Sequence, residues 1–98
     1  MAEPRVVDVP ERQRYELIVD DDVAGFVTYL RAPREITLFH TEVEDEYEGH
    51  GFGGVLAAAV LDDARAKNLA VRPLCPFIRK YIAEHPEYAD LVPPDFDR

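Results

Sequence analysis

The sequence is poor in the residues on which several classes of protein depend. Its single cysteine, Cys75, cannot form a disulfide within the chain, which favours a reducing compartment such as the cytoplasm. No apolar run approaches the ~20 residues of a membrane-spanning helix, and the N-terminus lacks a basic segment followed by an apolar one. We therefore expect a cytoplasmic protein without a signal peptide or a membrane partner. A chain of 98 residues allows one domain, spanning 1–98, with one modest core.

Basic residues are scarce in the middle of the chain. No lysine or arginine occurs between Arg34 and Arg65. The acids in that interval are Glu35, Glu42, Glu44, Asp45, Glu46, Glu48, Asp62 and Asp63. Together with a net charge of −9, this distribution argues against a nucleic-acid partner, whose phosphates would be repelled. A solvated surface position is the simpler interpretation of any one of these acids, but as a group they favour amines and polyamines.

What is present favours a mixed α/β fold. Hydrophobic residues make up 47% of the chain, which is typical of a globular protein. The predicted elements are antiparallel strands at 12–19, 23–30 and 35–43, a helix from Phe52 to about Lys67, a parallel strand at 69–74 and a helix after Pro76 that ends at His85-Pro86. Residues 1–11 are interpreted as a loose lead-in, so the ordered core is expected to cover about 13–92. The Asp20-Asp21-Asp22 run is interpreted as a turn rather than a metal site, and no metal site is predicted elsewhere.

The chain is organised around Tyr47-Glu48-Gly49-His50-Gly51-Phe52-Gly53-Gly54. A strand precedes this segment and a helix follows it. Glycines let the backbone approach a ligand closely, and the unpaired amides of the first helical turn then point at a phosphate. An ordinary strand-to-helix turn is the alternative, but four glycines in six positions exceed its needs. The absence of a nearby lysine excludes a P-loop, and the glycine spacing differs from that of the dinucleotide fingerprint.

The same segment resembles motif A of the GNAT N-acetyltransferases, Arg/Gln-x-x-Gly-x-Gly/Ala, with Glu48-Gly49-His50-Gly51-Phe52-Gly53 in that frame. Glu48 stands where the family usually has Arg or Gln, so only backbone amides can be carried over. Three further motifs, His40-Thr41-Glu42-Val43, Leu74-Cys75-Pro76-Phe77 and His85-Pro86-Glu87-Tyr88, extend the resemblance to the minimal YjdJ-type branch of that superfamily. It covers residues 13–92 and implies a compact GNAT fold.

The resemblance implies an acetyl-coenzyme-A-dependent N-acetyltransferase, expected to be monomeric, whose acceptor is an amine of a small molecule or a protein. The pantetheine arm of the coenzyme is expected between two diverging parallel strands, a position that suits Pro73 because proline cannot donate to a ladder. The residues that would bind the coenzyme are Thr41, Glu42, Val43, Gly49, His50, Gly51, Phe52, Gly53, Gly54, Cys75 and Phe77.

Three side chains are candidates for the chemistry of acyl transfer. His40 could take the proton of the amine, unless it is an ordinary strand residue. Cys75, just before a helix, could form an acyl-enzyme, act as an acid or simply pack. Tyr81 stands where many members of the family keep a general-acid tyrosine, and a core aromatic is an equally good interpretation. His40 and Cys75 are expected at the same end of the sheet, although a bulge would reverse the face that His40 occupies.

Two other functions stay open at this stage. The chain could be a module that holds coenzyme A without transferring anything and regulates a partner protein. It could also be a small interaction domain in which the glycine loop is only a tight turn. Turnover with release of free thiol separates the first alternative from the enzyme, and binding of coenzyme A separates the second from both.

Overall fold

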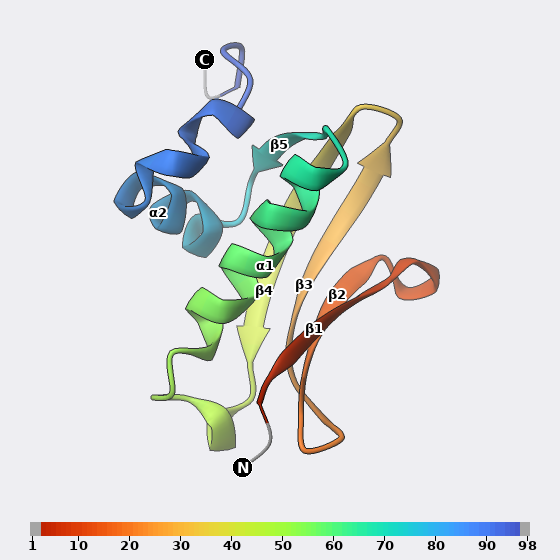
Figure 1. The fold of residues 1–98 in the computed structure, drawn as a ribbon, viewed down its shortest axis with the longest axis vertical. Helices are drawn as coiled ribbons and strands as arrows, with labels where there is room; N and C mark the ends of the chain where they lie inside the picture. The colour runs from red at the N-terminus through yellow and green to blue at the C-terminus, as the bar shows by residue number, and fades with distance from the viewer. Residues whose placement is uncertain (1–2, 97–98) are drawn as a thin grey trace.

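A computed structural model describes residues 3–96. It contains one five-stranded sheet in the order β1-β2-β3-β4-β5, in which β5 runs parallel to β4 and all other neighbours are antiparallel. The strands are β1 Arg5–Val9, β2 Arg14–Val19, β3 Asp22–Ala32, β4 Glu35–Val43 and β5 Ala70–Pro73. The helices are α1 Phe52–Ala66 and α2 Pro76–Glu84, with 3-10 turns η1 Pro10–Arg12, η2 Asp45–Tyr47 and η3 Pro86–Leu91. The expected mixed α/β fold is confirmed (Figure 1).

The interpretation of residues 1–11 as a loose lead-in is wrong for most of that stretch. Residues 5–9 form β1, which pairs with β2 from Arg5 opposite Ile18 to Val9 opposite Arg14. The antiparallel part of the sheet therefore has four strands rather than three, and the ordered core begins well before residue 13. A segment of five residues becomes a strand only when a partner supplies its hydrogen bonds, which the local sequence does not show.

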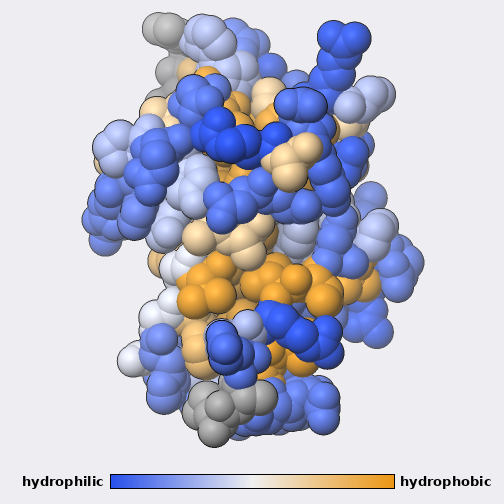
Figure 2. Space-filling model, in the orientation of Figure 1, coloured by the Kyte–Doolittle hydropathy of each residue, from blue (hydrophilic) through white to orange (hydrophobic). Residues whose placement is uncertain are grey.

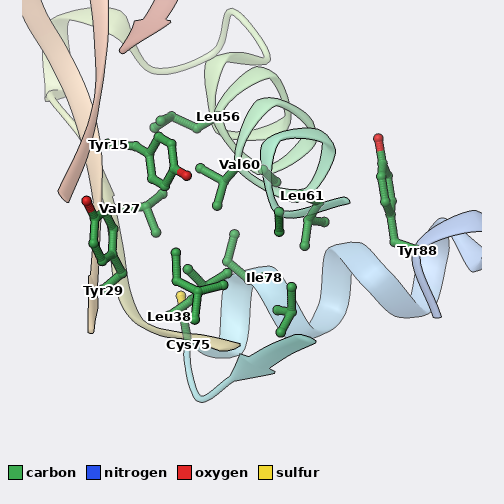
Figure 3. Close-up of a cluster of buried hydrophobic side chains, with 14 of the residues drawn as sticks. Tyr15, Val27, Tyr29, Leu38, Leu56, Val60, Leu61, Cys75, Ile78 and Tyr88 are labelled. Carbon is green, nitrogen blue, oxygen red and sulfur yellow. The ribbon is translucent and has the colours of Figure 1, made fainter. Parts of the chain in front are cut away.

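Helix α1 lies across one face of the sheet and closes the core (Figure 1). Its buried residues are Phe52, Leu56, Ala57, Val60, Leu61 and Ala64. Figure 3 shows Leu56, Val60 and Leu61 directed from α1 toward the sheet residues Val27 and Leu38. Val55 of the same helix is 38% exposed. None of the helices in the described part of the chain is long and apolar enough to span a membrane.

Two short connections agree with their predicted conformations. Asp20 and Asp21 both have a left-handed backbone, with φ of 49° and 70°, and form the tight turn between β2 and β3. Asn68 has φ of 58° just after α1, as expected for a residue that ends a helix. The chain then returns directly into β5.

A bulge in the pairing of β3 with β4 decides which side chains reach the core. Tyr29 pairs with Leu38 but Thr28 pairs with His40, so Phe39 is an extra residue in β4. Leu38 is buried against the helices, and beyond the bulge this face is continued by Thr41, opposite the buried Val27. The bulge therefore reverses the alternation of β4, and His40 does not share the face of Leu38. We call the face that carries His40 the outer face of the sheet.

Candidate functional site

Strands β4 and β5 diverge after a short parallel ladder. Their paired residues run only from Glu35 opposite Ala70 to Leu38 opposite Pro73. Pro73 has no amide hydrogen to continue the ladder, and the chain turns so that the Cys75 amide donates to the Leu38 carbonyl at 3.0 Å. Beyond this bond, residues 39–43 of β4 have no strand partner on that side within the described chain. The expectation of a splayed position for Pro73 is confirmed.

The glycine loop enters α1 through left-handed backbone. Gly49 has φ of 86° and Gly51 has φ of 75°. Residues with a Cβ rarely adopt these backbone angles. Gly51 is the residue just before the helix, and its carbonyl accepts the first helical hydrogen bond from the Val55 amide at 3.3 Å. The amides of residues 52–54 belong to the first turn and so lack acceptors within the helix. This is the strand–loop–helix arrangement that the sequence predicted for an anion cradle, with the positive end of the helix dipole behind the loop.

A groove of about 370 Å³ lies against this loop. Its lining residues are Val43, Tyr47, Glu48, Gly49, Gly51, Phe52, Gly53, Gly54 and Phe77. It therefore joins the end of β4, the loop, the beginning of α1 and α2. In Figure 2, apolar surface gathers around the first turns of α1 between hydrophilic regions. The lining includes no lysine or arginine and does include the carboxylate of Glu48.

Phe77 of α2 lines the groove, and its ring lies next to Gly53. A Cβ added to Gly53 would lie 2.8 Å from the Phe77 Cζ atom, closer than real Cβ contacts allow. Glycine at 53 therefore lets the Phe77 ring lie this near to α1 without shifting. The Phe77 ring is 42% exposed, so it offers an apolar surface beside the cradle.

Cys75 lies where the two strands diverge, at the residue before α2. Its side chain is only 2% exposed, and its sulfur lies 3.3 Å from the Thr41 hydroxyl oxygen of β4. Its carbonyl accepts a hydrogen bond from the Arg79 amide at 3.0 Å within α2. The thiol is thus held between the two elements that flank the divergence (Figure 3).

His40 lies on the outer face, opposite to the face that carries Thr41 and Cys75. Its Nε2 is 3.1 Å from a carboxylate oxygen of Glu42, and its ring centre is 6.2 Å from that of Phe26. The structure therefore places His40 and Cys75 along the same part of β4 but on its two sides. A proton acceptor on one side and a thiol on the other suit an acceptor that approaches from the outer face.

Tyr81 lies further along α2, and His85 directly follows the end of that helix. The two rings stack with centres 3.8 Å apart, and Tyr81 Cε1 lies 3.7 Å from where a Gly54 Cβ would be. Burial, and then the charges of Glu87 and Asp62, raise the pKa of Tyr81, so its hydroxyl is protonated at neutral pH. His85 Nδ1 donates to the Tyr81 carbonyl at 2.8 Å, as its predicted position at the helix end requires.

The His50 side chain contacts neither His40, Cys75 nor Tyr81 in the interactions of the described residues. Its ring is exposed and stacks on Phe52 with centres 5.4 Å apart. The sequence analysis expected His50 to contribute through its backbone amide, and this residue lies between the two left-handed glycines, Gly49 and Gly51.

Gly25 of β3 positions the site, although the sequence analysis assigned it no role. A Cβ at this residue would lie 2.6 Å from the Glu42 carbonyl oxygen and 3.2 Å from Leu56 Cδ1. Glycine therefore lets α1 and the end of β4 lie close to β3 at this residue. A glycine inside a strand otherwise rich in aromatic and β-branched residues is the signal that could have indicated this close approach.

Comparisons with known proteins agree with this geometry. A family model described as GCN5-related N-acetyl-transferase matches residues 14–91. Protein NATD1 of Mus musculus is 38% identical over 63 residues, covering 62% of this chain and 57% of the mouse protein. Protein NATD1 of Gallus gallus is 42% identical over 53 residues, covering 54% and 48%. The chain thus spans about half the length of the curated relatives it matches.

Solved structures show the same fold. A GCN5-like protein from Staphylococcus aureus superposes with a TM-score of 0.70 at 25% identity, covering 95% of this chain and 91% of that one. A ribosomal-protein-alanine N-acetyltransferase from Brucella melitensis superposes with a TM-score of 0.59 at 18% identity, covering 87% and 64%. The latter likeness concerns the fold alone. Because the family model matches residues 14–91, which include all the residues that line the groove, the chain belongs to the GCN5-related N-acetyltransferase family.

Proposed function

We propose that the protein is an N-acetyltransferase that uses acetyl-coenzyme A and acts on an amine, with the coenzyme in the groove beside the glycine loop. The observation that carries the proposal is the pair of left-handed glycines leading into α1 next to the divergence of β4 and β5. Membership of the family supports it. The four sequence motifs favour the minimal YjdJ-type branch. A monomer and a cytoplasmic location, the latter favoured by the single cysteine, belong to the same proposal.

The pyrophosphate, the pantetheine arm and the thioester of the coenzyme would each meet a suitable surface in this arrangement. The amides of residues 51–54 would hold the pyrophosphate, since they lack acceptors within the helix. The free edge of β4 at residues 41–43 would hold the pantetheine arm and the thioester carbonyl through backbone hydrogen bonds. Backbone amides at that edge would also stabilise the negative charge that develops on the carbonyl oxygen.

Three residues are proposed for proton and acyl transfer. His40 would accept the proton of the amine on the outer face. Cys75 would either take the acetyl group as an acyl-enzyme or supply the proton that the leaving thiolate needs. Tyr81, whose raised pKa keeps its hydroxyl protonated, is the other candidate for that acid.

Mass spectrometry after incubation with acetyl-coenzyme A and a panel of amines tests this function. We expect an acetylated amine together with stoichiometric free thiol, and any acetyl group on Cys75 would appear in the same spectra. Calorimetry with coenzyme A checks binding separately. Absence of thiol release with every amine would contradict the enzymatic proposal.

A coenzyme-A-binding module without turnover is the second candidate. The observation that favours it is the packing of Cys75, whose thiol is buried and already bonded to Thr41. Tight binding of coenzyme A without any acceptor-dependent thiol release would support this function. Failure to bind coenzyme A would instead support an interaction domain in which the loop is only a turn.

A further inference from the structure

A second hollow, of about 230 Å³, lies on the outer face near the end of β4. Its lining residues are Arg14, Val23, Gly25, Phe26, Glu42 and Glu44. Cross-strand pairing relates it to the groove beside the glycine loop. Phe26 pairs with Glu42, and both line the outer hollow; in the next pair, Gly25 lines the outer hollow and Val43 lines the groove. The two hollows therefore lie back to back across the end of the β3–β4 ladder.

The charge of this outer hollow is set by its carboxylates. The Arg14 guanidinium is already engaged, with its Nη2 2.7 Å from the largely buried carboxylate of Glu16 and its Cζ 4.6 Å from the centre of the Phe26 ring. Glu42 contacts His40 at 3.1 Å. Among the described residues, no lysine or arginine pairs with Glu44. A negative hollow with an aromatic wall is suited to an organic cation.

The hollow is also within reach of the reacting bond. Thr41 contacts Cys75 on the inner face, and its neighbours in sequence, His40 and Glu42, lie on the outer face. Among the described residues, no strand pairs with β4 on the β5 side beyond Leu38, so a ligand on the outer face could approach the divergence around this edge. A molecule that places one end in the hollow would pass His40 before its other end reaches the divergence.

We propose that the outer hollow binds the acceptor and that the acceptor is a short alkyl diamine or polyamine. This inference rests on the function proposed above. Glu42 and Glu44 hold the distal ammonium group, and the Phe26 ring contacts the carbon chain. The near ammonium loses a proton to His40, and its nitrogen forms a bond to the thioester carbonyl carbon. The carbon–sulfur bond breaks, and the sulfur leaves with the electron pair and takes a proton from the acid proposed above, Cys75 or Tyr81. The nitrogen loses its second proton, which passes through water and restores that acid. The products are the acetylated amine and the free thiol.

The test compares two acceptors of equal length, 1,4-diaminobutane and butylamine. We expect the wild-type protein to favour the diamine by about tenfold in kcat/KM, and Glu44→Gln to reduce that ratio by about fivefold. Glu11→Gln, which removes the same charge from an exposed residue outside the hollow, should leave the ratio unchanged. Phe26→Leu should also lower this ratio, and it replaces Glu44→Gln in the test if Glu44→Gln fails to fold.

Titration of 1,4-diaminobutane into the protein, followed by NMR amide shifts, separates failure of this inference from failure of the proposed function. Shifts confined to Phe26, Glu42 and Glu44 without turnover would uphold the hollow as a diamine site and overturn the transferase. Turnover with equal use of both amines would overturn the inference alone. So would a preference for acidic amines or for peptide lysines, or an equal effect of Glu44→Gln and Glu11→Gln.

Discussion

The hydroxyl oxygen of Thr41 lies 3.3 Å from the sulfur of Cys75, and this contact spans the point where β4 and β5 separate. It joins a strand end to a helix start that are 34 residues apart in the chain. The thiol therefore lies at the inner side of the place where the thioester is proposed to bind. Its role in chemistry can be separated from its role in packing.

Cys75→Ala should lower turnover by about 10²-fold if the thiol forms the acyl-enzyme or protonates the leaving group. Affinity for coenzyme A should change little, because the loop amides supply most of the binding. Thr41→Val is the matched variant, since it keeps the thiol and removes only the hydroxyl contact. Turnover and calorimetry are measured on both. Near-normal turnover of Cys75→Ala would show that the thiol only packs, and loss of folding in both would point to a structural role.

Two glycines of the loop should respond to alanine in opposite directions. Gly51 has φ of 75° and open space around its Cβ position, so Gly51→Ala should cost about 1 kcal/mol of stability through backbone strain alone. Gly54 is helical and a Cβ there would make an ordinary contact with Tyr81, so Gly54→Ala should stabilise by up to about 1 kcal/mol. Urea unfolding measures both. Equal effects would contradict the assigned backbone conformations.

Replacing Gly51 should also weaken the coenzyme. Gly51→Val is expected to lower affinity for coenzyme A at least about tenfold, or about 1.4 kcal/mol, because the strained loop no longer presents its amides together. Calorimetry on the folded variant provides the measurement. Unchanged affinity in a folded protein would remove the phosphate interpretation of the loop.

Glu48 should limit the affinity for coenzyme A. Its carboxylate lines the groove, which lacks lysine and arginine, so it opposes the phosphates that the amides attract. Glu48→Gln should therefore strengthen binding by about threefold, and added salt should strengthen binding to the wild-type protein. Glu46→Gln, two residues earlier and outside the groove lining, should have a smaller effect. Weaker binding by Glu48→Gln would indicate that this carboxylate contacts the ligand favourably.

The stability of the protein should depend on the ionisation of Asp63. Burial alone would raise the pKa of Asp63, but hydrogen bonds from Lys67 and Tyr15 outweigh it and hold the pKa below the usual 3.8. The ionised group therefore contributes stability above pH 3.8, and this contribution is lost as the pH falls through the lower folded-state pKa.

Asp63→Asn tests this dependence. The variant should be less stable than the wild-type protein at pH 7, and the difference should shrink in acid. Asp21→Asn is the matched control, because it removes a carboxylate from an exposed left-handed position that asparagine also adopts readily. A difference between Asp63→Asn and wild type that does not vary with pH would contradict the assignment.

Local pattern was sufficient for the features that depend on neighbours in the chain. Alternation located most of β2, β3 and β4, helical periodicity located α1 and α2, and the glycines predicted the strand–loop–helix order of the anion cradle. Asn68 and Pro76 likewise have the helix-end conformations that their chemistry favours. These features follow from backbone preference and side-chain spacing, which operate over a few residues.

The tertiary structure decided which faces and which distant segments meet. β1 exists because β2 offers it a partner, and Gly25 matters because α1 lies against it. One extra residue at Phe39 moved Thr41 to the thiol and His40 to the outer face, since a strand alternates every two residues and a single insertion reverses its sides. The sequence therefore determined where the loop, the two helices and all strands except β1 lie along the chain. Only the register between strands determined that the groove beside the glycine loop and the outer hollow lie on opposite faces of the sheet.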